Sequence, residues 1–142
     1  MVVHLRPATE ADQDVIRAMV FAERLDPTSL NWRNFIVAAD GREIIGIAQI
    51  KPHSDCREFG SLIVKPAYRR RGIGRQLVEA LLSKEAGEVY LLCAVRRVPY
   101  YRQFGFEVID NAQAPLTLRR KLRLVALLRF AGVHVVAMKR AA

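Results

Sequence analysis

The 142-residue sequence has few of the features that mark secreted, membrane-spanning or metal-binding proteins. Its two cysteines, Cys56 and Cys93, are too few for a disulfide framework and suit a reducing compartment. No apolar run approaches the roughly 20 residues that a membrane-spanning helix requires. The opening residues MVVHLRPATEADQD lack the apolar stretch of a secretory signal. No cluster of His, Cys or carboxylate residues has metal-ligand spacing. We therefore expect a cytoplasmic protein with no membrane span and no metal.

Acidic residues are also scarce, with 14 Asp and Glu against 23 Lys and Arg and a formal net charge of +9. Such a balance favours an anionic partner, which can be nucleic acid, a lipid surface or a phosphorylated small molecule. The basic, aromatic platforms that bind single-stranded nucleic acid are missing, and this disfavours a nucleic-acid partner.

The pattern of apolar residues predicts a mixed α/β (α+β) fold. No repeat or linker interrupts the chain, so residues 1–142 are expected to form a single domain. Strands are predicted at 2–6, on both sides of a hairpin turn at Asp40-Gly41, and at 58–64, 88–95, 106–109 and 133–140. Helices are predicted after Thr9, after Gly74, between Pro99 and Gly105, and over 117–130. The first predicted helix has the apolar face Val15, Ile16, Met19 and Val20, and the second has Ile73, Leu77, Val78, Leu81 and Leu82. Together these elements predict a mixed, mostly antiparallel sheet flanked by helices.

A basic, glycine-containing turn, KPAYRRRGIG at residues 65–74, lies between a predicted strand and a predicted helix. The N-terminus of a helix exposes unpaired backbone N–H groups and the positive end of the helix dipole, and both attract phosphate. Gly72 and Gly74 let the backbone curl and let a ligand approach it closely. Positive charge around this cradle comes from Lys65, Arg69, Arg70, Arg71 and Arg75. The alternative is a tight strand-to-helix turn with solvated arginines.

The turn matches neither of two common phosphate-binding loops. A nucleoside-triphosphate loop needs Lys-Ser or Lys-Thr after its second glycine, but Arg75-Gln76 stands there. A dinucleotide fingerprint needs a third glycine at position 77, which is Leu77.

The segment Arg69-Arg70-Arg71-Gly72-Ile73-Gly74 instead resembles the coenzyme A loop of GNAT-type N-acetyltransferases. The family pattern is Arg or Gln, two residues, Gly, one residue, then Gly or Ala. The preceding LIVKPAYR is similar to the family's strand end, and YYRQFGFEVI at 100–109 resembles its FYxxxGF segment. The resemblance covers residues 3–109 and the final strand. It leaves 110–132 as an atypical basic helical segment.

The resemblance implies a GNAT-like acyl-CoA N-acyltransferase fold with acetyl-CoA as cosubstrate. It implies a coenzyme site formed by Leu62, Ile63, Val64, Arg69, Arg70, Arg71, Gly72, Ile73, Gly74 and Arg75. In such a site the backbone N–H groups of residues 62–64 reach the thioester, beside a bulge that Gly60-Ser61 can accommodate. Tyr101 matches the family's general acid, which protonates the departing thiolate. The alternative is that Tyr101 only packs the short helix, which is the role expected of its neighbour Tyr100.

The resemblance also implies that Glu58 is the base that deprotonates the amine, directly or through water. The alternative is an exposed strand-end charge that pairs with Arg57 or another arginine. His53 is a second candidate base, or else a surface loop residue. The family's frequent asparagine seven residues before the tyrosine is replaced by Ala94, and the neighbouring Arg96 and Arg97 can bind phosphate or substrate instead.

These observations predict an N-acetyltransferase that transfers the acetyl group of acetyl-CoA to a primary amine of a small molecule or protein. One alternative is a catalytically inactive module that senses acyl-CoA, and another is a basic nucleic-acid-binding domain. A homodimer is possible within the family. Residues expected near the acceptor are Leu25, Leu30, Trp32 and the segment 110–132. For Trp32, its place just before the strand FIVAA favours the alternative of a core aromatic. The helix predicted at 117–130 has Leu118, Leu122, Val125 and Leu128 near one face, and Arg119, Arg120, Lys121 and Arg123 mostly off it. It either packs on the sheet with a solvated basic edge, borders an anionic ligand, or contacts a membrane or nucleic acid.

Overall fold

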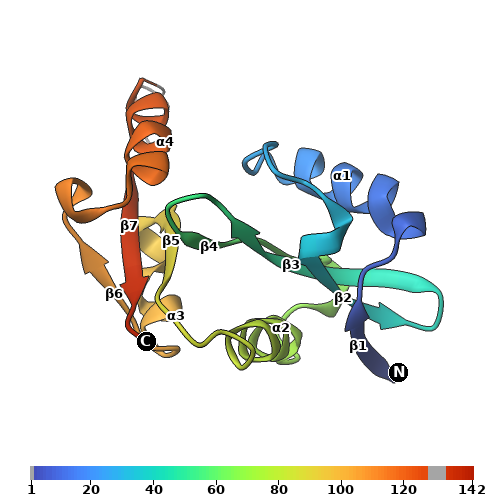
Figure 1. Ribbon diagram of the computed structural model, residues 1–142. Helices are drawn as coiled ribbons and strands as arrows, with labels where there is room; N and C mark the ends of the chain where they lie inside the picture. The colour runs from blue at the N-terminus through green and yellow to red at the C-terminus, as the bar shows by residue number, and fades with distance from the viewer. Residues whose placement is uncertain (1, 128–133) are drawn as a thin grey trace. The chain divides into compact units, whose positions relative to one another are not determined.

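The computed structural model describes residues 2–127 and 134–142 (Figure 1). Hydrogen bonding joins its strands in the order β1-β2-β3-β4-β5-β7-β6. The chain divides into two compact units, the first formed by Met1–Lys51 with Gly60–Lys84 and the second by Pro52–Phe59 with Glu85–Ala142. Strand β4 passes from the second unit into the first. The predicted mixed, mostly antiparallel sheet with flanking helices is confirmed, whereas the single domain 1–142 stays a prediction.

The first unit is built on consecutive strands near the N-terminus. Their bounds are Val3–Pro7 for β1, Phe35–Asp40 for β2, Glu43–Pro52 for β3 and Arg57–Val64 for β4. β1 and β2 are antiparallel, as are β2 and β3, with a register shift between Ala38 and Ala39. The predicted hairpin turn is confirmed: Gly41 adopts a φ of +61°, which costs glycine little.

Two helices lie on opposite sides of these strands (Figure 1). Thr9 precedes a 3₁₀ turn, η1 at Glu10–Asp12, which leads into α1 at Gln13–Ala22. Asp12 Oδ2 accepts a hydrogen bond from Thr9 N at 2.8 Å, so the helix start is capped by its own first turn. α1 buries Ile16, Met19 and Val20 in the core. The prediction that Val15 shares this face is wrong, since Val15 is 40% exposed.

The second helix, α2 at Ile73–Leu82, buries the entire predicted stripe of Ile73, Leu77, Val78, Leu81 and Leu82. It packs closely on the strands at Gly46, where an added Cβ would lie 3.1 Å from Leu77 Cδ1 and 3.4 Å from Ala38 Cβ. Glycine at this position lets the helix approach the sheet. The rigid packing holds the N-terminus of α2, and the turn before it, against the end of β4.

The second unit is centred on β5 at Val89–Ala94. β5 runs parallel to β4 at the Glu58–Tyr90 pair and antiparallel to β7 at Val135–Arg140. β7 also pairs with β6 at Phe106–Ile109. Between β5 and β6 stand the 3₁₀ turn η4 at Val95–Arg97 and the short helix α3 at Val98–Arg102, with Pro99 in its first turn. Gly105 has a φ of +93° and directs the chain from α3 into β6.

The basic segment forms the turn η5 at Asn111–Gln113 and the helix α4 at Leu116–Ala126. α4 buries Leu118 and Leu122 in a cluster with Ala114 and Ala137. The prediction that this helix packs on the sheet is therefore confirmed for the described residues. The part of the predicted helix at 128–130 lies outside them, as does Leu128, which was expected on the apolar face.

Candidate active site

The arginine-rich turn of the first unit links β4 to α2. Residues Pro66–Tyr68 form the 3₁₀ turn η3, and Arg70 then adopts a left-handed φ of +65°. Gly72 has φ +79° and ψ 8° at the N-cap of α2, and its carbonyl oxygen accepts a hydrogen bond from Gln76 N at 3.1 Å. An added Cβ at Gly72 would meet nothing within 4 Å, so the glycine is required by its backbone conformation and not by crowding. The exposed backbone of this turn can therefore receive a ligand.

The arginines of the turn differ in their surroundings. Arg69 braces the turn, because its Nε donates to Val64 O at 2.8 Å and its Nη2 to Glu23 Oε1 at 3.1 Å. The Arg71 guanidinium lies 5.8 Å from the centre of the Tyr68 ring, and Tyr68 donates to Asp40 at 3.1 Å. All four predicted arginines, Arg69, Arg70, Arg71 and Arg75, are exposed. Arg69 is thus a structural brace, and the positive charge around the α2 N-terminus faces solvent.

The strand before the turn is irregular where the sequence predicted it to be. Ser61 has a φ of +56°, a left-handed conformation that is uncommon outside glycine. This interrupts the extended backbone directly before Leu62, Ile63 and Val64. Lys65 N then donates to Ile45 O of β3 at 2.8 Å. Strain of this kind is concentrated at functional sites, which agrees with the expected role of this strand.

In the second unit, Tyr101 lies in an aromatic cluster on α3. Its ring makes edge-on contacts with Phe59, Tyr100 and Phe106, with centroid distances of 6.0, 5.2 and 6.2 Å. Burial raises the pKa of the Tyr101 phenol well above its usual range. The phenol therefore remains protonated at neutral pH, as an acid must. Tyr100 packs edge-on against Phe104 as well, so its predicted packing role is confirmed.

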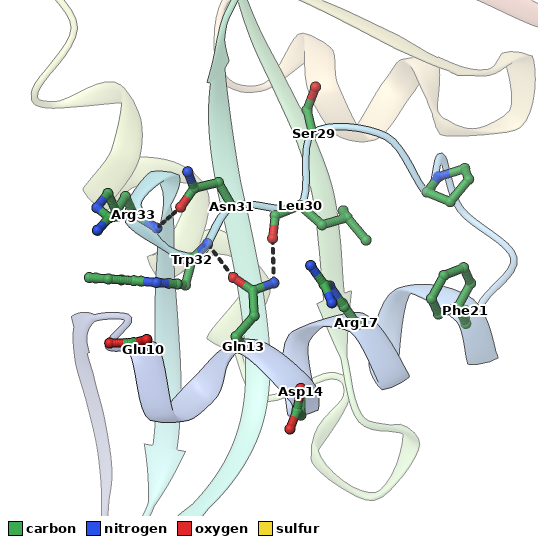
Figure 2. A pocket seen from close by; sticks show the side chains of 11 residues that line it. Glu10, Gln13, Asp14, Arg17, Phe21, Ser29, Leu30, Asn31, Trp32 and Arg33 are labelled. Carbon is green, nitrogen blue, oxygen red and sulfur yellow. Dashed lines mark hydrogen bonds between the residues drawn. The ribbon is translucent and has the colours of Figure 1, made fainter.

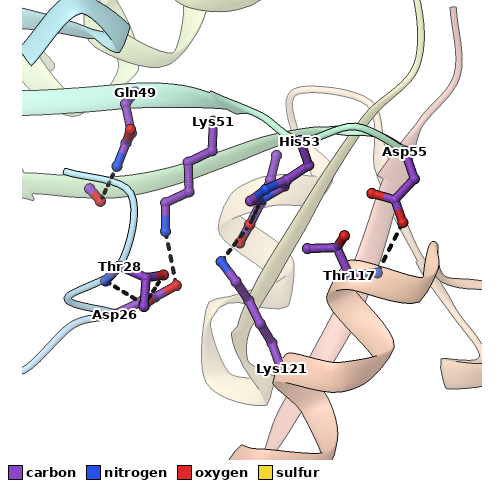
Figure 3. A network of polar contacts seen from close by, with 10 residues as sticks. Asp26, Thr28, Gln49, Lys51, His53, Asp55, Thr117 and Lys121 are labelled. Carbon is purple, nitrogen blue, oxygen red and sulfur yellow. Dashed lines mark hydrogen bonds and ion pairs between the residues drawn. The ribbon is translucent and has the colours of Figure 1, made fainter. Parts of the chain in front are cut away.

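Glu58 is a buried carboxylate at the start of β4, with 4% of its surface exposed. Its Oε1 lies 2.8 Å from His53 Nε2 and accepts a hydrogen bond from Lys121 Nζ at 2.9 Å (Figure 3). Arg57 pairs with Glu85 instead, with Nη2 3.1 Å from Oε2. The alternative interpretation of Glu58 as an exposed strand-end charge is therefore wrong. The structure brings the two candidate bases of the sequence, Glu58 and His53, into direct contact.

Lys121 is the member of this cluster that the sequence did not reveal. The sequence placed it off the apolar face of its helix, with the solvated arginines. Lys121 lies between the buried residues Leu118 and Leu122 on α4, and this position at the edge of the buried face was the available signal. The helix is fixed at its start by Asp55, whose Oδ2 accepts a hydrogen bond from Thr117 N at 3.0 Å and whose pKa is lowered by that bond (Figure 3). The turn before β4 thereby holds the start of α4, the helix that carries Lys121.

The remaining predicted residues have less distinct surroundings. Arg96 and Arg97 are exposed in η4. Trp32 is partly buried against the core of the first unit, as a core aromatic would be. It also borders an open hollow of about 920 Å³ between α1 and the 27–33 segment (Figure 2). Gln13 bridges the two sides of this hollow, as its amide donates to Leu30 O and accepts from Trp32 N.

Over residues 2–127 and 134–142, no helix combines the length and apolar character needed to cross a bilayer. The same stretches hold no group of three or more His, Cys, Asp or Glu side chains that could bind a metal ion.

Known proteins provide an independent comparison. Residues 31–108, more than half of the chain, match the family model described as an acetyltransferase (GNAT) domain. The chain is 29% identical over 133 residues to mycothiol acetyltransferase of Clavibacter sepedonicus, covering 83% of this chain but only 43% of that protein.

Solved structures show the same fold. N-acetylglutamate synthase of Neisseria gonorrhoeae, solved with coenzyme A and N-acetylglutamate, superposes with a TM-score of 0.78 at 20% identity, over 99% of this chain and 35% of that one. A Mycobacterium tuberculosis protein solved with CoA has a TM-score of 0.75 at 17% identity, over 98% of this chain and 99% of that one. Acetyl-CoA is the cosubstrate of the matched family. The chain belongs to the GNAT acetyltransferase family.

Proposed function

We propose that this chain is an acetyl-CoA-dependent N-acetyltransferase that acts on a primary amine of a small molecule or protein by direct attack. The observation that carries the proposal is the turn before α2. There, a glycine in the left-handed conformation exposes a helix N-terminus surrounded by arginines. This is the arrangement that binds a diphosphate through backbone N–H groups, and the family match covers it. When bound, acetyl-CoA supplies an activated acetyl group as a thioester.

Binding of the coenzyme falls to residues of the first unit. The N–H groups at Gly72, Ile73 and Gly74 hold the diphosphate. The positive charges of Arg70, Arg71 and Arg75 compensate the negative charge of the diphosphate. The N–H groups of Leu62, Ile63 and Val64 contact the pantetheine arm and the thioester oxygen. The left-handed Ser61 supports this role, because it interrupts the extended backbone just before them.

Tyr101 acts as the general acid. Attack by the amine forms a C–N bond and breaks the C–S bond, and the leaving thiolate takes the phenolic proton. Burial raises the pKa of the Tyr101 phenol and so keeps it protonated at neutral pH, which means that a proton is present when the thiolate forms.

Glu58 and His53 act together as the base. The 2.8 Å contact between Glu58 Oε1 and His53 Nε2 can orient the imidazole, as a carboxylate orients a catalytic histidine elsewhere. The amine proton passes to this pair. Lys121 holds Glu58 in place through the 2.9 Å ion pair between its Nζ and Glu58 Oε1.

The Lys121 contact also favours a second candidate function, an inactive module that binds acyl-CoA. A carboxylate that is already paired with an ammonium is a weaker proton acceptor than a free one. Calorimetry with acetyl-CoA and CoA release with a panel of amines separate the two functions. Binding with CoA release supports the enzyme, binding without CoA release from any acceptor supports the sensor, and no binding contradicts both.

The variant Tyr101→Phe tests the mechanism directly. We expect kcat to fall by about 100-fold or more with little change in the Kd for acetyl-CoA, because only the proton donor is removed. Tyr100→Phe is the matched control, since it removes a neighbouring hydroxyl that has no assigned catalytic role. Equal kcat values for the wild type and Tyr101→Phe would remove Tyr101 from the mechanism.

The variants Glu58→Gln and His53→Gln show which of the two side chains takes the amine proton. If His53 takes the proton, both variants lose kcat. If Glu58 takes it directly, only Glu58→Gln loses most of its activity. The cytoplasmic location and the homodimer stay predictions of the sequence.

A further inference from the structure

Lys51 is buried on β3 of the first unit in a position that lysine rarely occupies. Its side chain is 2% exposed, and its Nζ lies 2.9 Å from Asp26 Oδ2 (Figure 3). The Asp26 side chain is 35% exposed, so the ion pair lies immediately beneath the surface. Lysine is almost never fully buried unless it is paired, because its ammonium loses hydration. A surface carboxylate thus covers a buried cation.

Gln49, two residues earlier on the same strand, is also fully buried. Its Nε2 donates to Ser61 Oγ at 3.0 Å. Among the described residues, its Oε1 has no hydrogen-bond partner. Leaving a buried acceptor unpaired costs about 1–3 kcal/mol, so such an atom indicates a missing donor.

These two side chains lie next to the strand that is proposed to contact the thioester. Ser61, the partner of Gln49, directly precedes Leu62, Ile63 and Val64. Residues i and i+2 of a strand point to the same face and are about 7 Å apart. An unpaired acceptor and a buried cation therefore stand side by side, and the acceptor is closer to the β4 residues proposed to contact the thioester.

We infer that Gln49 and Lys51 form the acceptor subsite and that the acceptor is a small molecule with a carboxylate beside its primary amine. Gln49 Oε1 accepts a hydrogen bond from the amine, and Lys51 Nζ binds the carboxylate. Because both side chains lie on one face of β3, two residues apart, an acceptor whose amine and carboxylate are separated by one or two carbon atoms can contact both. This inference rests on the proposed function and identifies its substrate class.

Asp26 is the carboxylate that occupies Lys51 in the absence of the acceptor. It lies in the irregular segment 23–31, where Arg24 and Ser29 adopt left-handed φ values of 55° and 58°. Its other oxygen, Oδ1, accepts from Thr28 N at 2.9 Å and Thr28 Oγ1 at 2.6 Å. An incoming carboxylate takes the place of Oδ2 on Lys51, and the segment opens with Asp26.

Gly60 on β4 lies against the lysine side chain. An added Cβ at this position would be in ordinary contact with it, 3.4 Å from Lys51 Cε and 3.7 Å from Nζ. The ammonium therefore lies against the backbone of β4, one residue before Ser61. This places the cation of the subsite beside the strand that carries the residues proposed to contact the thioester.

The test compares amino acids with the amines formed by removing their carboxylate, in an assay of CoA release. We expect the wild type to prefer the carboxylated acceptor of each pair, mainly through KM. In Lys51→Met, KM for the carboxylated acceptor should rise by about tenfold or more, while the acceptor without a carboxylate changes by less than about twofold. Lys84→Met is the control, because it removes an exposed lysine of the same unit.

Asp26→Asn should have the opposite effect. Asparagine keeps an oxygen for Thr28 but removes the charge that competes for Lys51. KM for the carboxylated acceptor should then fall by about threefold or more. KM for the amine without the carboxylate should not change. A structural ion pair would give the contrary result, since both variants would then lower stability and leave acceptor preference unchanged.

Gln49→Met separates a ligand contact from a packing role. It removes the unpaired buried oxygen at similar volume, so thermal stability should be retained while KM for every acceptor amine rises. If stability falls and KM is unchanged, Gln49 is only structural and the subsite is wrong.

The two levels of the proposal fail differently. If acetyl-CoA does not bind and no acceptor releases CoA, the proposed function itself is wrong. If CoA is released equally with and without the acceptor carboxylate, and Lys51→Met does not change the ratio, the function stands and the subsite is overturned. Acetylation only of peptides that lack a carboxylate near their amine overturns it as well.

Discussion

The backbone of Gly72 provides the most direct test of the coenzyme site. Gly72 has a φ of +79°, and an added Cβ would meet nothing within 4 Å. Any L-residue placed there pays the cost of the left-handed conformation, about 1–2 kcal/mol, without a steric clash. Gly72→Ala and Gly72→Trp therefore share the same backbone penalty and differ only in the bulk that they place above the helix N-terminus.

The two variants should lose similar thermal stability and differ in coenzyme affinity. A penalty of about 1–2 kcal/mol lowers the melting temperature by roughly 2–8 °C in a chain of this size. In Gly72→Trp the indole blocks the approach of the diphosphate to the helix N-terminus. The complex then lacks charge-assisted hydrogen bonds worth about 1.5–3 kcal/mol. The Kd for acetyl-CoA should rise by about 10- to 100-fold in Gly72→Trp and by much less in Gly72→Ala.

Calorimetric titration with acetyl-CoA, beside thermal unfolding of the same samples, gives both quantities. The alanine variant controls for backbone strain. If the tryptophan variant binds acetyl-CoA with the wild-type Kd while it shows the expected loss of stability, the diphosphate does not rest against this backbone. The proposed site would then be wrong.

Three other predictions concern stability and reactivity. Arg6 donates a hydrogen bond to Asp12 and lowers the pKa of that carboxyl below its usual range. The ionised form therefore stabilises the folded state at neutral pH, and this contribution is lost as the pH falls through the lowered pKa. Asp12→Asn should cost about 1–2 kcal/mol in urea unfolding at pH 7 and should flatten the loss of stability in acid; an unchanged acid profile would contradict the pairing. Burial raises the pKa of the Cys93 thiol to about 11, and burial together with the nearby Asp55 raises that of Cys56 to about 12. Iodoacetamide at pH 8 should therefore alkylate both thiols about 100-fold or more slowly than free cysteine, and mass spectrometry can measure this rate. Rates within tenfold of free cysteine would show that the thiols are not buried. Gly46→Val should lower the free energy of unfolding by about 1–3 kcal/mol, because its Cβ would lie 3.1 Å from a leucine of α2, and an unchanged melting temperature would mean that α2 packs less closely.

The sequence was sufficient to predict the elements and the coenzyme turn because both depend on local chemistry. The spacing from Ile73 to Leu82 fixes which face of α2 is buried, whatever that face packs against. Asp40-Gly41 specifies a hairpin by its own backbone preferences. Gly72 likewise marks a left-handed position at a helix start, and a short motif around it is enough to suggest the family.

The polar contacts near the proposed chemistry were decided by tertiary structure alone. Lys121 pairs with Glu58 across 63 positions of the chain, and Lys51 pairs with Asp26 across 25. The neighbouring letters do not distinguish Lys51 from the solvated lysines, and for Lys121 they show only its place between Leu118 and Leu122, without the partner. Whether a charge is buried depends on which strand registers and helix faces meet around it, and these are set by packing between segments that are distant in the sequence.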